Sequence, residues 1–392
     1  MAHWAKEVHS GPSKLVNQDG FLFYTYNGNH YLCNYVGKKT EPVLPDCYKG
    51  ESYEIVAGAF ADCKNLTGIH ISSLEAWCNI SFSGENPLIY AHKLYINGEL
   101  LTDLVIPYGT IIIEDSVFEG CTSLRSVVIP DTVVWVQDHA FAGCTNLASV
   151  IIPDNVGLIE ASAFEDCSSL TDIILPDGLY KIDDSTFKGC TSLRAVGIPD
   201  SVTYIEGWAF ANCTNLMSLF IPESVTRINA GAFENCASLM DVSLPDGLKT
   251  LGFDAFKGCT RLIKTENGVQ YVGDWAISCD KTVTSVTLRE NTRGIAGQAF
   301  RDCQNLTSIV LPDGVTTICV QAFMKCTSLT SITIPYNVTS IDFRAFEGCS
   351  ALTSITFNGT VAQWNAMDRD SSWNYKLAAT QVICTDGIVN LK

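Results

Sequence analysis

The 392-residue chain has few charged residues and especially few basic ones. Charged side chains make up 17% of it, and 25 lysines and arginines stand against 42 aspartates and glutamates, which gives a formal net charge of -17. A nucleic-acid-binding surface needs a basic stripe that displaces counterions, and docking on anionic lipid needs a polybasic patch. The sequence therefore predicts neither a nucleic-acid partner nor attachment to an anionic membrane surface.

Long hydrophobic runs are also missing. No apolar stretch reaches the roughly 18 residues of a membrane-spanning helix, so we expect no membrane insertion. The first residues, MAHWAKEVHSGPSKLV, lack the hydrophobic region of a secretory signal peptide. Two explanations stay open: the protein is intracellular, or this chain is the mature or excised part of a longer one.

Motifs for catalysis and cofactor binding are absent as well. The sequence has no G-x-S-x-G, no phosphate-binding loop and no H-E-x-x-H, and none of its six histidines stands beside a nucleophile motif. No C-x-x-C occurs, and no histidine recurs with the cysteines, which argues against a metal site. We expect a protein that is not an enzyme, with no catalytic residue, no cofactor and no metal.

The sequence does contain a repeat of about 23 residues. Cysteines recur at 121, 144, 167, 190, 213, 236 and 259, and again at 303, 326 and 349. Leucine follows each of these cysteines by three positions, phenylalanine precedes each by three, and in most units proline follows by nine. A unit this short cannot bury its apolar residues alone, whereas stacked units form one continuous core. The pattern predicts a solenoid.

Each unit predicts two extended segments. L-x-x-[VI]-x-[IL] indicates a strand that ends at the proline, and the later V-x-x-I indicates a second, shorter one. A-F-x-x-C predicts a turn of 3₁₀ or irregular helix. Units from Gly98 and Asp280 fit without a cysteine, so these two residues are expected at the cysteine position.

Three segments depart from the repeat. Residues 1–50 predict aromatic strands around an Asn-Gly turn. Capping-box spacing at Ser72 and Glu75, and again at Thr360 and Gln363, predicts two short helices, each carrying a tryptophan. An Asn-Gly pair within 265–280 predicts a hairpin, either a functional bulge or a tolerated insertion. The expected organisation is an N-terminal cap (1–50), a first repeat with a helical insertion (51–97), regular repeats (98–258), an irregular hairpin-containing repeat (259–279), further repeats (280–348) and a C-terminal cap (349–392).

The repeated L-x-x-[VI]-x-[IL]-P-x-x-V-x-x-I-x-x-x-A-F-x-x-C resembles the BspA-like, or treponemal-type, leucine-rich repeat over roughly residues 51–357. The resemblance implies a β-rich α/β solenoid, a curved right-handed superhelix with a parallel sheet on its concave side. It also implies a bacterial surface or secreted protein, in many members an adhesin for host or microbial proteins. The segments NPLIYAHKLYINGELLTDLVIP and NGVQYVGDWAISCD are similar to elements of gut Firmicutes members.

Seventeen cysteines suggest a disulfide protein by number, but their register argues otherwise. Ten occupy one position beside leucine and phenylalanine, and free cysteine is among the most buried residue types. Side chains stacked in the same direction rarely meet the torsion requirement of a disulfide. We therefore expect a buried column of free thiols. Pairs among the remaining cysteines could still be bridged.

An acidic residue follows the proline in most units, as in Asp131, Asp154, Asp177, Asp200, Glu223, Asp246 and Asp313. Carboxylates stacked about 5 Å apart repel one another, which bound Ca²⁺ would relieve. Aspartate after proline is also an ordinary turn residue. We favour the turn because the alternating ligands of a calcium loop are missing.

The exposed face of the first strand is the best candidate for binding. Period-two alternation points one residue per unit outward, and several of these are apolar: Val128, Ile151, Ile174 and Phe220. Such a stripe either marks an interaction site or simply stabilises strands. A second set, Trp135, Tyr204 and Trp208, belongs to the second segment and the turn after it, and either binds a partner or covers seams between coils, which we favour.

These observations predict a non-enzymatic, extracellular or cell-surface protein that binds a host or microbial protein through its concave strand face. We expect it to be a monomer. The alternative is a structural spacer or stalk within a larger surface protein.

Overall fold

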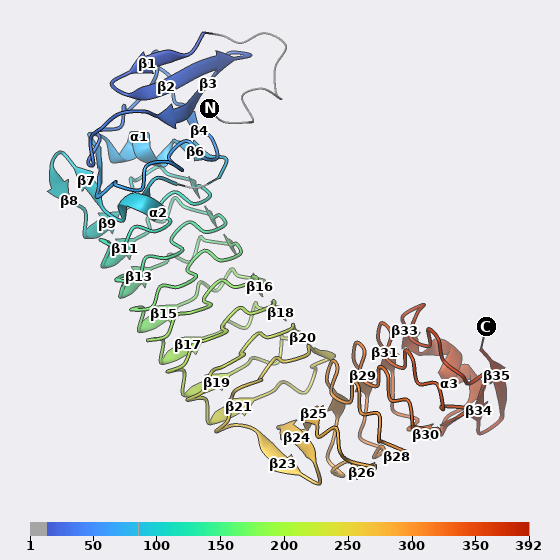
Figure 1. Cartoon of the computed structure of the whole chain (residues 1–392). Helices are drawn as coiled ribbons and strands as arrows, with labels where there is room; N and C mark the ends of the chain where they lie inside the picture. The colour runs from blue at the N-terminus through green and yellow to red at the C-terminus, as the bar shows by residue number, and fades with distance from the viewer. Residues whose placement is uncertain (1–13, 85, 392) are drawn as a thin grey trace. The chain divides into compact units, whose positions relative to one another are not determined.

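A computed structural model describes residues 14–84 and 86–391 of the chain. The model divides into two compact units. The first comprises the described residues up to Leu179 together with Thr186–Leu193, and the second comprises Tyr180–Ser185 and the chain from Arg194 onward. Each unit is a stack of short coils (Figure 1). The chain is a β-solenoid with parallel stacked strands and little helix, which confirms the predicted fold class.

In each repeat, the segment after the leucine forms a strand of three or four residues that ends before or near the proline. We call these strands the first strand series. In the first unit they are β9 (Asp103–Val105), β11 (Ser126–Val128), β13 (Ser149–Ile151) and β15 (Asp172–Ile174). In the second unit they are β17 (Ala195–Gly197), β19 (Ser218–Phe220), β21 (Asp241–Ser243), β26 (Ser285–Thr287), β28 (Ser308–Val310), β30 (Ser331–Ile334) and β32 (Ser354–Phe357).

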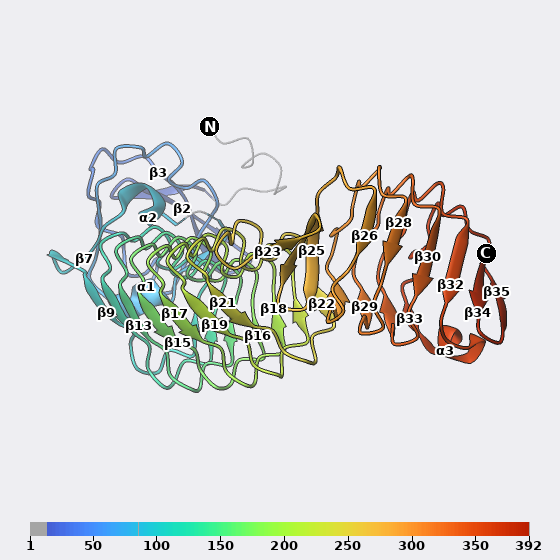
Figure 2. The same ribbon diagram turned by 90° about the horizontal axis from the view of Figure 1, so that it is seen from below.

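Where neighbouring strands of this series pair, they are parallel and in register, because equivalent residues lie one repeat apart. Ser126 pairs with both Asp103 and Ser149, for example. In the second unit, Figure 2 shows β26, β28, β30 and β32 side by side. The middle residue of most of these strands is buried and its two neighbours are exposed, which is the alternation expected of a strand with one face on the core.

The V-x-x-I segment forms a second strand series of two-residue strands, whose second residue is usually buried. In the first unit these are β10 (Ile112–Ile113), β12 (Trp135–Val136) and β14 (Leu158–Ile159). In the second unit they are β16 (Lys181–Ile182), β18 (Tyr204–Ile205), β20 (Arg227–Ile228), β22 (Thr250–Leu251), β27 (Gly294–Ile295), β29 (Thr317–Ile318), β31 (Ser340–Ile341) and β33 (Asp368–Arg369). These pairings are parallel too.

The predicted 3₁₀ or irregular helix at A-F-x-x-C is wrong as a helix. The structure has separate turns there, such as the one closed by the Cys144 N–H donating to the Phe141 carbonyl at 3.2 Å. The residue five positions before the cysteine interrupts any helix because its backbone is left-handed. Its φ is 54° at His139, 55° at Ser162 and 53° at Trp208.

The N-terminal cap contains the predicted aromatic strands. Strands β1 (Val16–Gln18), β2 (Phe21–Tyr26) and β3 (Asn29–Tyr35) are antiparallel, and β4 (Glu54–Ile55) and β6 (Ser81–Phe82) complete their sheet. The β2–β3 hairpin turns at Asn27 and Gly28, both with positive φ, as the Asn-Gly pair predicts. A second sheet contains β5 (Ile69–Ile71), β7 (Leu94–Ile96) and β8 (Glu99–Leu100). Residues 1–13 of the predicted cap lie outside the described part of the chain.

Short helices interrupt the coils near both ends. Helix α1 (Leu74–Cys78) begins one residue later than the capping box predicts, because Ser73 caps it and accepts from the Ala76 N–H. Helix α3 (Val361–Ala366) has the predicted capping box of Thr360 and Gln363. Helix α2 (Leu88–Ala91) was not expected from the sequence.

The irregular repeat forms a three-stranded antiparallel sheet from β23 (Lys264–Glu266), β24 (Val269–Val272) and β25 (Trp275–Cys279). Its first hairpin turns at Asn267 and Gly268 as predicted. Strands β34 (Gln381–Cys384) and β35 (Gly387–Asn390) form a second antiparallel hairpin, which follows β32 in its sheet.

The core of each unit is a set of ladders in which one residue type stacks on itself. Phenylalanine rings from successive repeats lie nearly parallel, with centroids 5.5 Å apart for Phe118 and Phe141, 5.4 Å for Phe141 and Phe164, and 5.7 Å for Phe164 and Phe187. The cysteines and leucines of the repeat are fully buried beside them. The repeated positions are therefore buried between coils, and the variable positions remain at the surface.

Candidate interaction surface

The cysteine column is buried and makes a recurring hydrogen bond that the sequence pattern does not reveal. The thiol of Cys167 donates to the carbonyl of Phe141 at 3.3 Å, and Cys144 and Cys349 make the same bond one repeat back, to Phe118 at 3.2 Å and Phe323 at 3.0 Å. Each bond links a coil to the one before it. A weak donor of this size therefore suits the position better than alanine, because it fills the space and also donates.

Burial raises the pKa of several of these thiols, whereas the hydrogen bond with Cys279 lowers the pKa of Cys303. The pKa of Cys121 is raised to about 11, and those of Cys144 and Cys167 lie well above the usual range of a thiol. Because the thiolate is the nucleophile and the metal ligand, such groups are chemically inert. The column therefore packs and links coils.

The two cysteine-free units differ from expectation. Gly98 and Asp280 are both exposed, so neither occupies the buried column. Gly98 lies in the turn between β7 and β8, where its φ is 88°. In the later unit Cys279 takes the place predicted for Asp280, because its thiol lies within hydrogen-bonding reach of Cys303.

All seventeen cysteines lie in the described part of the chain and all are free. The column is unbridged, as predicted, and no pair among the remaining cysteines is bridged either. Cys47 is the exposed one.

The outward positions of the first strand series are exposed, as the alternation predicts. In the first unit the exposed fractions are 36% for Val128, 62% for Ile151 and 84% for Ile174. In the second unit Phe220, on β19, is 66% exposed.

Sequence reasoning missed one member of this set. Val105 on β9 is 63% exposed and pairs in register with Val128. It belongs to a unit without a cysteine, and the strand pattern around Leu104 was the signal that could have found it. We call the four residues of the first unit, Val105, Val128, Ile151 and Ile174, the apolar ridge.

Carboxylates border the apolar ridge on both sides. Asp131, Asp154 and Asp177 are exposed, each three residues after a ridge residue. Asp103 and Asp172 begin β9 and β15, two residues before one. Among residues 102–108, 125–131, 148–154 and 171–177, these five acids stand against the single cation Arg125.

The acid after each proline lies in a turn, as we favoured. The N–H of Val133 donates to the carbonyl of Pro130 at 3.1 Å, and Val156 donates to Pro153 in the same way at 3.1 Å. Across the described residues, no group of three or more histidine, cysteine, aspartate or glutamate side chains is placed to hold a metal ion. The Asp103 carboxylate accepts the Ser126 hydroxyl at 2.6 Å, and this bond lowers its pKa.

The aromatic set belongs to the second strand series and does not join the ridge. Trp135 starts β12 and is half-buried between Ile112 and Leu158, its in-register neighbours. Tyr204 starts β18, and the Arg227 guanidinium lies over its ring at 5.1 Å. Each of these rings is therefore partly covered by side chains of adjacent coils.

Trp208 occupies a left-handed backbone position that bulky residues seldom adopt. Its indole lies over Gly231 of the next repeat, where an added Cβ would stand 2.5 Å from Nε1. The ring is nonetheless exposed over much of its surface. This contact agrees with a ring that covers the seam between coils.

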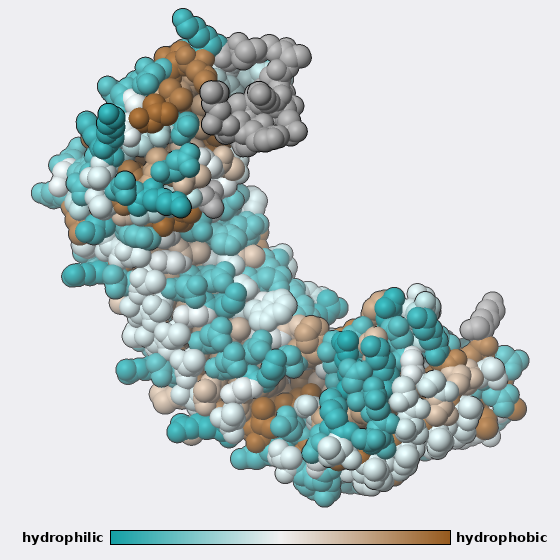
Figure 3. All heavy atoms as spheres, viewed as in Figure 1, coloured by the Kyte–Doolittle hydropathy of each residue, from teal (hydrophilic) through white to brown (hydrophobic). Residues whose placement is uncertain are grey.

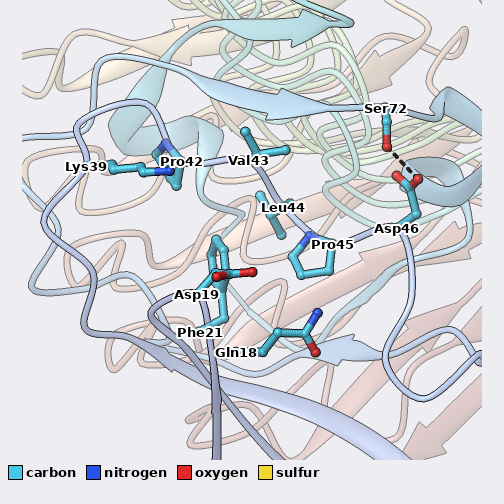
Figure 4. Close-up of a pocket in the computed structure, with 10 residues that line it drawn as sticks. All are labelled: Gln18, Asp19, Phe21, Lys39, Pro42, Val43, Leu44, Pro45, Asp46 and Ser72. Atoms are coloured by element: carbon cyan, nitrogen blue, oxygen red, sulfur yellow. Dashed lines mark hydrogen bonds between the residues drawn. The ribbon is translucent and has the colours of Figure 1, made fainter.

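A shallow pocket of about 280 Å³ opens in the N-terminal cap (Figure 4). Lys39, Asp19 and Asp46 line it, and the Ser72 hydroxyl donates to Asp46 at 2.5 Å. Its lining contains no histidine or cysteine, so it holds no pairing of a nucleophile with a histidine base. On the face shown in Figure 3, hydrophobic side chains gather over this cap.

None of the described helices is long and apolar enough to cross a membrane.

The repeat matches a known family model, that of the BspA type leucine rich repeat region, over residues 90–217, 180–307 and 261–367. Together the three matches cover more than half of the chain. The chain belongs to this family. No curated protein matches it.

Three solved structures are similar to this BspA-type chain. A leucine rich cell surface protein from Faecalibacterium prausnitzii is 23% identical, covers 93% of this chain and 100% of its own, and has a TM-score of 0.40. A leucine-rich repeat protein from Bacteroides ovatus is 21% identical over 93% of this chain and 98% of its own, with a TM-score of 0.47. The T. pallidum leucine rich repeat protein is 26% identical over 63% of this chain and 90% of its own, with a TM-score of 0.37.

Proposed function

We propose that this BspA-type protein is a non-enzymatic binding module of adhesin type, which acts outside the cell or at its surface and recognises a host or microbial protein. The observation that carries the proposal is the apolar ridge, where the in-register strands β9, β11 and β13 and the following strand β15 each present an exposed aliphatic side chain. Contiguous exposed apolar surface of this kind marks interaction sites. Phe220 is a separate candidate in the second unit, while Trp135, Tyr204 and Trp208 are weaker candidates because neighbouring coils partly cover them.

The buried thiols are compatible with an oxidising medium outside the cell. Oxidation proceeds through the thiolate, and burial raises the pKa of column cysteines such as Cys144 and Cys167, which suppresses oxidation there. The proposed fold therefore needs no disulfide in its column, and we expect the protein to be a monomer.

The test is capture of extracellular host proteins and surface proteins of neighbouring bacteria, followed by variants. Ile151→Asp with Ile174→Asp should leave the urea unfolding curve in place, because both side chains are exposed, and should weaken capture at least tenfold. Ile111→Asp with Val134→Asp is the matched control, since these residues are exposed in the same unit but lie off the ridge. Phe220→Asp tests the second unit separately.

Two outcomes count against the proposal. Capture that the ridge variant leaves unchanged would remove the ridge from the binding site. A chain that captures nothing, although it folds, would favour the spacer instead.

A further inference from the structure

We infer that the partner segment bound by the apolar ridge is a cationic amphipathic helix, with apolar residues along one face and lysine or arginine on both sides of it. This inference rests on the proposed function and adds the chemistry of the partner. Three observations carry it: the spacing of the ridge, the charge on its two borders and the pairing of its strands.

The ridge has the spacing of a helix. It runs across the strands, so successive residues are one coil apart: about 4.8 Å where the strands pair, while the phenylalanine rings elsewhere in the same coils are 5.4 to 5.7 Å apart. An α-helix has a pitch of about 5.4 Å. A helix lying along the ridge therefore presents one turn to each of Val105, Val128, Ile151 and Ile174, over about 11 residues.

The two borders set the charge of the partner. Asp131, Asp154 and Asp177 form one border, and Asp103 and Asp172 lie on the other. A helix is about 10 Å wide with its side chains, so long cationic side chains on its flanks can reach both borders. Positively charged side chains of the partner are attracted to the carboxylates at both borders, and negatively charged side chains are repelled by them.

The same features argue against other occupants. A second copy of this chain would bring its own carboxylates to the same surface, and like charges across an interface are unfavourable. Strand addition needs a free sheet edge, whereas β11 already pairs with β9 on one side and β13 on the other. Nucleic acid is excluded by charge.

The probe is a capped 14-residue helical peptide of leucine and lysine, with leucine on one face, whose binding to the full chain is followed by fluorescence anisotropy. The matched peptide carries glutamate in place of lysine. We expect the lysine peptide to bind and the glutamate peptide to bind at least tenfold more weakly. Raising the salt concentration should weaken binding of the lysine peptide, because salt screens exposed ion pairs.

Variants locate the binding. One border is neutralised by Asp131→Asn, Asp154→Asn and Asp177→Asn together. This variant should bind the lysine peptide about tenfold more weakly, as expected for the loss of three exposed ion pairs. The control removes three exposed carboxylates elsewhere in the same unit, with Asp62→Asn, Glu75→Gln and Asp115→Asn, and should change binding less than twofold. The double variant Ile151→Ser with Ile174→Ser should also bind the lysine peptide more weakly.

The outcomes separate this inference from the proposed function. If border and control variants weaken the peptide equally, the attraction is to net charge alone and the inference is wrong. The inference also fails if the glutamate peptide binds as well as the lysine peptide, or if neither binds. If in those cases capture of a natural partner still depends on the ridge, the proposed function stands without it. If ridge variants change neither peptide binding nor capture, both fall.

Discussion

The column thiol of Cys167 offers a direct measure of what the repeated cysteine contributes. Truncation to alanine removes a fully buried sulfur, which costs about 1 kcal/mol in transfer free energy by comparison with a buried methylene. The cavity left by one heavy atom adds roughly 0.6 kcal/mol. Loss of the 3.3 Å bond to the Phe141 carbonyl adds about 0.5 kcal/mol, at the low end because that carbonyl still accepts the Cys144 N–H.

Cys167→Ala should therefore lower the free energy of unfolding by about 2 kcal/mol. Urea unfolding followed by circular dichroism measures it, and with a slope of about 3 kcal/mol per molar the midpoint falls by up to roughly 0.7 M. Cys47→Ala is the matched control, because Cys47 is exposed and its truncation should leave the midpoint in place. Equal midpoints for the two variants, with unchanged slopes, would refute the packing role argued for the column.

Three further predictions follow from single contacts. Phe164→Ala should lower the free energy of unfolding by about 3 to 5 kcal/mol in the same urea assay, since its ring is buried between rings on both sides; a loss below about 1 kcal/mol would contradict the ladder. Burial, and after it the charge of Asp368, raises the pKa of Asp342 to about 6. The ionised carboxylate therefore destabilises the fold fully above about pH 6, and the destabilisation disappears below about pH 4, where the group is protonated in both the folded and the unfolded state. Asp342→Asn should accordingly raise stability at pH 7 by up to about 3 kcal/mol and leave it unchanged at pH 4, as urea midpoints at the two pH values will show; equal shifts would contradict the pKa argument. Gly231→Ala should cost roughly 1 to 3 kcal/mol, because φ is 63° and the new Cβ meets Trp208, and part of the loss should be recovered by adding Trp208→Gly.

The repeat made the strands and the buried ladders predictable, because a 23-residue period repeats each core residue at one place in every coil. The phenylalanine and cysteine columns, the alternation on β13 and the Asn-Gly turns all followed from spacing and residue type. These features depend on local pattern, and the pattern recurs often enough to remove ambiguity.

The turns before each cysteine were not predictable in the same way. The left-handed residue five positions before the cysteine is serine, histidine, tryptophan, glycine, aspartate, glutamine or arginine in different repeats, so no residue preference marks it. The residue immediately before the cysteine is also left-handed, and there glycine, asparagine and aspartate recur, as at Gly143, Asp166 and Asn212. That second signal was present in the sequence, because these residue types tolerate the conformation.

The placement of helix and cap residues depended on contacts beyond the local sequence. Ser72 and Ser73 both have hydroxyls suited to capping, and the choice falls to Ser73 because Ser72 donates to Asp46 in a distant segment. Likewise Cys279 reaches Cys303 because the hairpin of β24 and β25 directs the chain there. Spacing alone could not have identified either partner.

A repeat of this kind separates the residues that hold the fold from those that are free to recognise a partner. The repeated cysteine, leucine and phenylalanine residues pack one coil against the next, so a substitution at any of these positions destabilises the neighbouring coils as well. The outward positions of the first strand series contact mainly solvent, and between repeats they vary from valine and isoleucine to glycine, phenylalanine, serine and threonine without altering the strand. In the first unit four successive repeats nevertheless carry aliphatic residues there, although threonine would serve the strand equally well. Strand stability alone therefore does not account for the run of aliphatic residues, and the apolar partner proposed above would.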